Sequence, residues 1–252
     1  MSFQNKKVLF LGATSGIGRA LASKLISTGT SVIVVGRRKD KLSEFVSQHS
    51  SNVSGAKASS AVFDITDTKA IPEFIAQQFK EHPDIDSVFL NSGIQRAVDW
   101  TNADKVNLET IDLEVLTNYT SFLHLTKAVL PYLQKDSSKP TSLVFTTSGL
   151  ALLPIEHCPN YCAIKAALHH HILILREQLK RAGSNVKVIE IFPPAVQTEL
   201  HDFEMGEEKG RALGMPLDAF VEEAFEGLCK EGVEGEQIPV GDTHKRMGFY
   251  EW

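Results

Sequence analysis

Two residues of the sequence, Tyr161 and Lys165, are spaced for proton transfer. Residues four apart on a helix lie one above the other on the same face, so this spacing places an ammonium group beside a phenol. A free tyrosine has a pKa of about 10, and a nearby positive charge favours its ionised form. At about 4 Å and an effective dielectric constant of about 20, that charge lowers the pKa by at most about 3 pH units. We therefore expect Tyr161 to act as a general acid or base.

Ser148 supplies a second polar group for the same site. A tyrosine and a lysine at this spacing also occur by chance on amphipathic helices, so the pair alone is weak evidence. Ser148, however, closes the apolar run 143–147, which is typical of a buried strand. Because ligands of open parallel sheets bind at the carboxyl ends of the strands, we expect Ser148, Tyr161 and Lys165 to share one site.

A glycine-rich loop indicates a nucleotide site. Residues 12–18 have the pattern Gly-x-x-x-Gly-x-Gly and connect an apolar run to a segment with helical periodicity. Glycines let the backbone approach a pyrophosphate, and the free N–H groups of a helix N-terminus favour its negative charge. The alternative is a glycine-rich turn without a ligand, but the flanking strand and helix favour nucleotide binding. The expected contacts are Gly12, Thr14, Ser15, Gly16, Ile17 and Gly18.

The end of the second predicted strand indicates which nucleotide binds. An acidic residue at this position normally accepts the 2′-hydroxyl of the adenosine ribose. Here the strand ends in Arg37 and Arg38, and two guanidinium groups can bind a 2′-phosphate in fork geometry. The alternative is a pair of solvated surface arginines. The position favours the first reading, so we expect NADP(H) as the cofactor.

Composition and charge exclude several classes of protein. With 252 residues, 42% hydrophobic and 23% charged, the chain is typical of a globular protein. A net charge of −5 argues against a nucleic-acid or anionic-membrane partner. No apolar run is long enough to cross a membrane, the N-terminus lacks a secretion signal, and three cysteines give no disulfide framework, so we expect a cytoplasmic protein. The run His169-His170-His171 cannot converge on one ion, because adjacent helical residues point about 100° apart; we expect no metal.

Strand-like and helix-like segments alternate along the whole chain. Strands are predicted at 8–11, 32–35, 61–65, 88–90, 143–146, 186–191 and 238–240, and helices at 19–26, 41–48, 71–79, 113–133, 161–181 and 217–229. This alternation favours an α/β fold: a Rossmann-type, doubly wound parallel sheet of about seven strands with helices on both faces. We expect one NAD(P)-binding domain over residues 1–252, with an irregular substrate loop at about 194–216.

With the glycine loop, Ser148, Tyr161 and Lys165 together, the sequence resembles the short-chain dehydrogenase/reductase family over essentially its whole length. Leu90 and Pro194 depart from the family pattern, and the segment with two consecutive prolines is similar to the DltE-like subgroup. The resemblance implies a catalytic role for Asn118. It also implies cofactor contacts at Asp64, Ile65, Asn91, Gly93, Pro193, Val196 and Thr198, besides Tyr161 and Lys165.

The resemblance further implies reversible hydride transfer between a nicotinamide and a small carbonyl or alcohol compound, with Tyr161 exchanging the proton. Ser148 would bind the reacting oxygen, Lys165 the nicotinamide ribose, and Asn118 a water. The chain is thus expected to be an NADPH-dependent carbonyl reductase that forms a homodimer or homotetramer. The rival is a non-catalytic dinucleotide sensor or scaffold. If Ile94, Leu150, Leu152, Leu153 and Phe192 converge, the substrate is apolar or aromatic. The aromatic tail at 249–252 would cover either an interface or the cleft.

Overall fold

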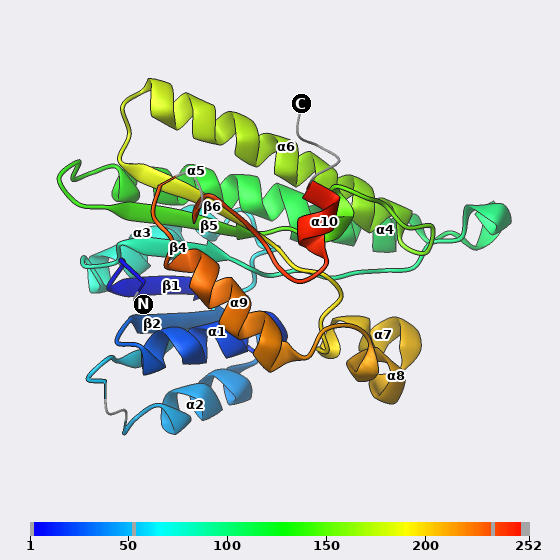
Figure 1. The fold of residues 1–252 in the computed structure, drawn as a ribbon, viewed down its shortest axis with the longest axis horizontal. Helices are drawn as coiled ribbons and strands as arrows, with labels where there is room; N and C mark the ends of the chain where they lie inside the picture. Colours follow the sequence, from blue (N-terminus) through cyan, green and yellow to red (C-terminus); the bar gives the residue numbers. More distant parts are fainter. Residues whose placement is uncertain (1–2, 52–53, 233–234, 248–252) are drawn as a thin grey trace.

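The computed structural model describes residues 3–51, 54–232 and 235–247; the aromatic tail at 249–252 lies outside them. Its centre is a sheet with the strand order β3-β2-β1-β4-β5-β6-β7, and all paired strands are parallel (Figure 1). The order reverses direction between β1 and β4, as in doubly wound folds. The strands are β1 (Lys7–Leu11), β2 (Ser31–Gly36), β3 (Ala58–Val62), β4 (Ser87–Leu90), β5 (Thr141–Thr146), β6 (Val186–Phe192) and β7 (Gln237–Pro239).

Two apolar cores cover the two faces of the sheet. Successive residues of a strand point to opposite faces, so Val8 and Phe10 of β1 enter one core whereas Leu9 and Leu11 enter the other. Helices α1 (Gly16–Ser27), α2 (Lys39–Gln48) and α9 (Leu217–Leu228) complete the first core. Helices α3 (Ile71–Glu81), α5 (Ser121–Leu133) and α6 (Pro159–Arg181) complete the second. The predicted Rossmann-type fold is confirmed.

The third strand differs from its prediction. The sequence favours 61–65, but β3 covers Ala58–Val62 and, among the described strands, pairs with β2 alone, from Val32 opposite Ala58 to Gly36 opposite Val62. An edge strand leaves one side open, so it tolerates the polar Ser59 and Ser60. The apolar residues after it pack elsewhere, since the Phe63 ring stacks on Phe74 of α3.

The long helix predicted at 113–133 is divided in the structure. Helix α4 (Leu108–Val115) passes through a π-helical turn, η2 (Leu116–Thr120), into α5. The segment 194–216, expected to be irregular, carries η4 (Glu199–His201), α7 (Asp202–Met205) and α8 (Glu207–Ala212); we call it the lid. In Figure 1, α7 and α8 lie together beyond one end of the sheet. The remaining elements are η1 (Trp100–Lys105), η3 (Gly149–Ala151) and α10 (Thr243–Met247).

The base of the lid is closed by a backbone bridge between Val196 and Met215. The Met215 amide donates to Ala195 at 2.8 Å, and the Gln197 amide donates to Met215 at 3.0 Å. The helices α7 and α8 are therefore carried on a fixed stem beside β6. Across the residues that the structure describes, no helix is both long and apolar enough to cross a membrane.

Candidate active site

The structure brings Ser148, Tyr161 and Lys165 together. Ser148 lies two residues beyond β5 and begins η3, while Tyr161 and Lys165 lie one turn apart on α6. The Ser148 hydroxyl lies near enough to the Tyr161 phenol to lower its pKa by hydrogen bonding, and Lys165 Nζ lies 5.5 Å from the centre of the Tyr161 ring. All three side chains are buried. The geometry thus provides two hydroxyls and an ammonium group in one enclosed place.

Burial, rather than the lysine, dominates the electrostatics of this cluster. Burial raises the pKa of Tyr161 above its ordinary value, although the hydrogen bond with Ser148 acts in the opposite direction. Burial also lowers the pKa of Lys165 to about 8. The expected lowering of the Tyr161 pKa by Lys165 is therefore absent from this structure. The reason is that the ammonium nitrogen is directed to the Thr146 carbonyl oxygen at 2.9 Å, and desolvation of the phenolate outweighs the distant charge.

Asn118 holds the loop that follows β4. It lies in the π turn η2 and is fully buried. Its Nδ2 donates to the Ile94 carbonyl at 2.7 Å, and its Oδ1 accepts from the Ile94 amide at 2.9 Å. Both hydrogen-bonding groups of the side chain are thus engaged by one residue, which fixes Ile94 against η2. The water-binding role implied by the family resemblance stays a prediction.

The glycine loop is shaped by close contacts with the turn after β4. Gly12 has a φ of +85°, and a Cβ there would overlap the Ser92 backbone. A Cβ at Gly18 would overlap the Gly12 carbonyl oxygen. The helix that follows, α1, has no side-chain cap at Ser15 and no acidic residue in its first turn. Its N-terminal N–H groups are therefore placed to bind an anion.

A cavity of about 460 Å³ opens between the glycine loop and the lid. Thr14, Ser15 and Gly16 line it from the loop, and Thr198 and Arg211 line it from the lid. Ser148, Tyr161 and Lys165 are not among its lining residues. The groups suited to proton transfer therefore lie in the side-chain cluster and not in this cavity, whose lining residues include no buried acid–base pair. The cavity adjoins the anion-binding end of α1 instead.

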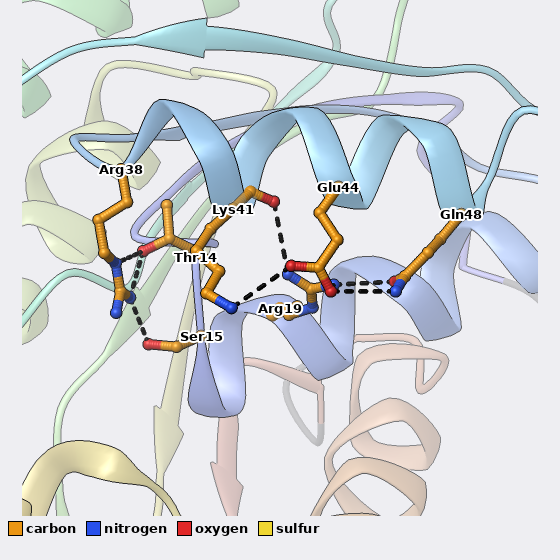
Figure 2. A network of polar contacts seen from close by, with 7 residues as sticks. All are labelled: Thr14, Ser15, Arg19, Arg38, Lys41, Glu44 and Gln48. Atoms are coloured by element: carbon orange, nitrogen blue, oxygen red, sulfur yellow. Dashed lines mark hydrogen bonds and ion pairs between the residues drawn. The ribbon is translucent and has the colours of Figure 1, made fainter.

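The two arginines after β2 take different partners. Figure 2 shows the Arg38 guanidinium reaching from the start of α2 to the glycine loop, where it donates to Thr14 Oγ1 from Nε at 3.1 Å and to Ser15 Oγ from Nη2 at 2.6 Å. Arg37 instead lies 3.6 Å from the Asp64 carboxylate. Burial alone would raise the pKa of Asp64, but hydrogen bonds from Thr66 and the charge of Arg37 bring it below its ordinary value. The expected fork of two guanidiniums is therefore spread over two sites.

Helix α2 is fixed beside α1 by a second group of polar contacts in Figure 2. Arg19 of α1 donates from Nη2 to Glu44 at 3.1 Å and to Gln48 at 2.8 Å, and Lys41 Nζ donates to the same carboxylate at 3.4 Å. These contacts set the position of Arg38 at the N-terminus of α2 relative to the glycine loop.

Other predicted cofactor residues have structural partners in this state. Asn91 Nδ2 donates to the Gly12 carbonyl at 3.0 Å, and its Oδ1 accepts from Thr146 Oγ1 at 2.9 Å, so it joins the ends of β1, β4 and β5. Gly93 follows in the same turn, and a Cβ on it would lie 3.5 Å from Asn118 Oδ1. Ile65 packs in the second core.

The remaining predicted cofactor positions follow β6. The Pro193 carbonyl accepts from the Gly149 amide at 2.9 Å, Val196 is buried, and Thr198 Oγ1 accepts from the Leu200 amide at 3.4 Å. These contacts bring the β6 end, η3 and the lid stem to the same edge of the sheet.

The apolar residues proposed to line a substrate pocket do not all converge. Leu150 packs against the cluster of Cys158, Tyr161 and Cys162. Leu152 and Phe192, however, are almost completely buried, and the Phe192 ring contacts His169 in the interior. These two residues therefore belong to the packed interior rather than to a cleft.

Sequence reasoning missed two buried carboxylates. Glu190 of β6 is fully buried, lies 3.0 Å from His169 Nδ1 and accepts from Thr147 Oγ1 at 2.8 Å. Glu114 of α4 is also fully buried. An acidic residue inside the otherwise apolar run 188–192 is a signal for the first. Nothing in the local sequence distinguishes the second from a solvated helix residue.

Comparison with known proteins agrees with this geometry. Residues 6–209 match the short chain dehydrogenase family, so the chain belongs to that family of oxidoreductases. It is 33% identical to the uncharacterized oxidoreductase DltE of Bacillus subtilis, over 92% of this chain and 87% of that protein. It is 31% identical to sulfoacetaldehyde reductase 2 of Chromohalobacter salexigens, over 76% of this chain and 73% of that protein. The predicted family and its DltE-like relatives are confirmed.

Solved structures share the fold. A short-chain dehydrogenase/reductase from Burkholderia phymatum, in complex with NAD, superposes with a TM-score of 0.82 at 18% identity, covering 99% of this chain and 92% of that one. Serine dehydrogenase complexed with NADP⁺ gives a TM-score of 0.78 at 24% identity, covering 93% of this chain and 94% of that one. The neighbours therefore include proteins with either nucleotide.

Proposed function

We propose that this protein is an NADPH-dependent reductase that converts a small ketone or aldehyde to an alcohol, reversibly, with Tyr161 as the general acid. The observation that carries the proposal is the buried cluster of Ser148, Tyr161 and Lys165. A phenol kept protonated by burial is a proton donor over the whole neutral range. A protein that only bound a nucleotide would not need an enclosed acid next to a hydroxyl and an ammonium group.

The residues at the carboxyl edge of the sheet fit a dinucleotide. The uncapped N-terminus of α1 offers N–H groups to a pyrophosphate, and the glycines leave room for it. When bound, the nicotinamide supplies or accepts the hydride at the carbonyl carbon. NADP(H) is favoured because Arg38 lies on the loop residues Thr14 and Ser15, where a guanidinium can bind a 2′-phosphate, and Arg37 lies beside it in sequence.

The protein's own part in the reaction is the handling of the oxygen and its proton. Tyr161 donates its O–H to the oxygen as charge develops there, and Ser148 donates a second hydrogen bond to the same oxygen. Lys165 keeps a positive charge one turn below Tyr161, which favours the phenolate left after proton transfer. In the oxidation direction the same groups act in reverse.

A panel of ketones and aldehydes tests the proposal, with NADPH consumption followed by its absorbance. We expect turnover with some members, and Tyr161→Phe should lower kcat by about 10²- to 10⁴-fold while NADPH still binds. Unchanged turnover in Tyr161→Phe would sink the assignment of the acid. If the unmodified protein binds NADPH tightly but none of the carbonyl compounds in the panel leads to NADPH consumption, it is the dinucleotide sensor instead.

We also propose that residues 1–252 form one domain that assembles as a homodimer or homotetramer. Ile174 on α6 and Leu113 on α4 are large apolar side chains exposed on helices that flank the sheet. Light scattering on the purified protein measures the mass directly, and a monomer at micromolar concentration would contradict the assembly.

A further inference from the structure

Glu114 is a buried acid for which the proposed reaction has no use so far. It lies in the last turn of α4 and has no exposed surface. Burial raises its pKa above the ordinary value, while its hydrogen bonds oppose that change. A buried carboxylate is costly unless it is well paired, so its partners show what it does for the protein.

The two oxygens of Glu114 bind two different segments. Oε1 accepts from the backbone amide of Arg96 at 2.9 Å, and Oε2 accepts from Asn160 Nδ2 at 2.6 Å. Arg96 belongs to the loop after β4, and Asn160 is the residue directly before Tyr161 on α6. One carboxylate therefore joins this loop to the start of the helix that carries the acid.

The same loop is held at a second point from the same helical segment. Asn118, four residues after Glu114, holds both backbone groups of Ile94. Gln95, between the two anchors, is buried and donates from Nε2 to Cys158 Sγ at 3.0 Å. Each residue of the loop 94–96 thus has a fixed partner: Ile94 binds η2, Gln95 binds the N-cap residue of α6, and Arg96 binds α4.

The loop also contacts the lid. The Arg96 guanidinium lies 4.0 Å from the centre of the Phe203 ring on α7, a cation–π distance, and its Nη1 donates to the Gln95 carbonyl at 2.6 Å. A displacement of Arg96 would therefore change where the lid rests.

We infer that Glu114 is a positioning residue for carbonyl reduction: it fixes the loop 94–96 against the start of α6 and so sets where the carbonyl compound and the lid lie relative to Tyr161. The inference rests on the proposed function, because it needs a carbonyl substrate between these segments. Displacements of about 1 Å in such supporting contacts reduce rates about 10²-fold in other enzymes.

The chemistry of the site calls for a carboxylate rather than an amide. A carboxylate accepts from both donors, whereas a glutamine offers one oxygen and would turn its NH₂ group toward one of them. The negative charge also acts on the acid–base pair, since it raises the pKa of both Tyr161 and Lys165. Besides Glu114, the groups whose charge acts on Tyr161 are the thiols of Cys158 and Cys162, and Ser148 is its hydrogen-bond partner; Glu190 acts on Lys165.

Two substitutions separate the hydrogen bond from the charge. Glu114→Gln removes both the charge and one bond, whereas Asn160→Ala removes one bond and keeps the charge. We expect each to raise the KM for the carbonyl compound and to lower kcat/KM at least tenfold, with the Kd for NADPH unchanged within twofold. Activity should fall at alkaline pH as Lys165, with its pKa of about 8, loses its proton. Only Glu114→Gln should move this fall to lower pH, because the Lys165 ammonium group then loses a stabilising negative charge.

A double variant and a matched control complete the experiment. In Glu114→Gln with Asn160→Asp, the new amide can donate to the new carboxylate, so the bond is restored with its direction reversed and we expect kcat/KM to recover at least threefold over Glu114→Gln. Glu109→Gln makes the same change at an exposed position of α4 and should behave as the unmodified protein. Thermal unfolding is recorded for every variant.

The outcomes distinguish the inference from the function on which it rests. Kinetics of Glu114→Gln equal to those of Glu109→Gln would overturn the inference alone. The inference would also be overturned if Glu114→Gln only reduced the fraction of protein that is folded, while the folded protein kept the KM and the pH profile of the unmodified protein. Absence of NADPH turnover in the unmodified protein would overturn the proposed function first, and the inference with it.

Discussion

Lys165 Nζ donates to the carbonyl oxygen of Thr146, the last residue of β5, at 2.9 Å. Ser148 follows two residues later, so the end of one strand positions both groups that flank Tyr161. The lysine is thereby held beside the face of the Tyr161 ring, 5.5 Å from its centre. The proton-transfer cluster is consequently built into the sheet and does not depend on the position of the lid.

Removal of the Ser148 hydroxyl tests the second hydrogen bond to the reacting oxygen. We expect Ser148→Ala to lower kcat about 10²-fold, because a lost donor to a developing oxyanion costs about 3 kcal/mol. The measurement is steady-state NADPH consumption at saturating carbonyl substrate. Ser43→Ala, at an exposed position of α2, is the control and should leave kcat unaltered. A kcat for Ser148→Ala within threefold of the unmodified value would remove Ser148 from the mechanism.

The pH dependence of reduction should report Lys165. Its pKa of about 8 means that the side chain is an ammonium ion below that pH and a neutral amine above it. Tyr161, whose pKa is raised, stays protonated through the same range. We therefore expect kcat/KM to fall as the pH rises through about 8. In Lys165→Arg the charge persists, so its residual activity should show no such limb; a limb that survives there belongs to another group.

The cofactor preference should depend more on Arg38 than on Arg37. Arg38 already contacts the glycine loop, whereas Arg37 pairs with Asp64. Hydrogen bonds to charged groups contribute about 1.5–3 kcal/mol, so Arg38→Ala should lower the preference for NADPH over NADH about 10- to 100-fold. Arg37→Ala should have a smaller effect, and Arg37→Asp should erase or reverse the preference. Equal kcat/KM with both nucleotides in the unmodified protein would refute the assignment.

The pair of Glu190 and His169 should contribute to stability. Both are buried, and removing one partner of a buried pair leaves the other charge or hydrogen-bonding group without compensation. We expect His169→Ala to lower the free energy of unfolding by about 3–5 kcal/mol in urea titrations. His170→Ala, one residue along but exposed, should change it by less than about 0.5 kcal/mol. Equal values for the two variants would show that the pair contributes little.

The fold was predictable because its signals are local and repeated. Apolar runs of strand length alternate with helical periodicity, and each strand end that bears a site residue carries its own mark, such as the glycine loop or Ser148. The position of the third strand was predicted wrongly because an edge strand needs little apolar sequence. Ser59 and Ser60 interrupt the apolar pattern within β3, so the strand could not be recognised there. The short helices of the lid have too few turns to leave a periodic pattern.

The site could be predicted only where it depends on the spacing of residues along the chain. The contact of Tyr161 with Lys165 follows from a separation of four residues, but the direction of the Tyr161 pKa follows from burial, which spacing does not encode. Glu114 could not be recognised for a related reason. Its partners, the amide of Arg96 and the side chain of Asn160, are 18 and 46 residues away along the chain.

The π turn η2 affects the candidate site without contributing to the sheet. A π turn holds one residue more than the α turn it replaces. Deleting a single residue between Leu116 and Thr120 would let an ordinary α-helix run through this segment, with the packed faces of α4 and α5 kept in place. The two hydrogen bonds between the Asn118 side chain and the Ile94 backbone would then be lost, whereas the sheet and both cores would remain. The length of this one turn thus decides whether the Asn118 side chain faces Ile94, so a change in residue number here would act on the loop after β4 without changing a strand.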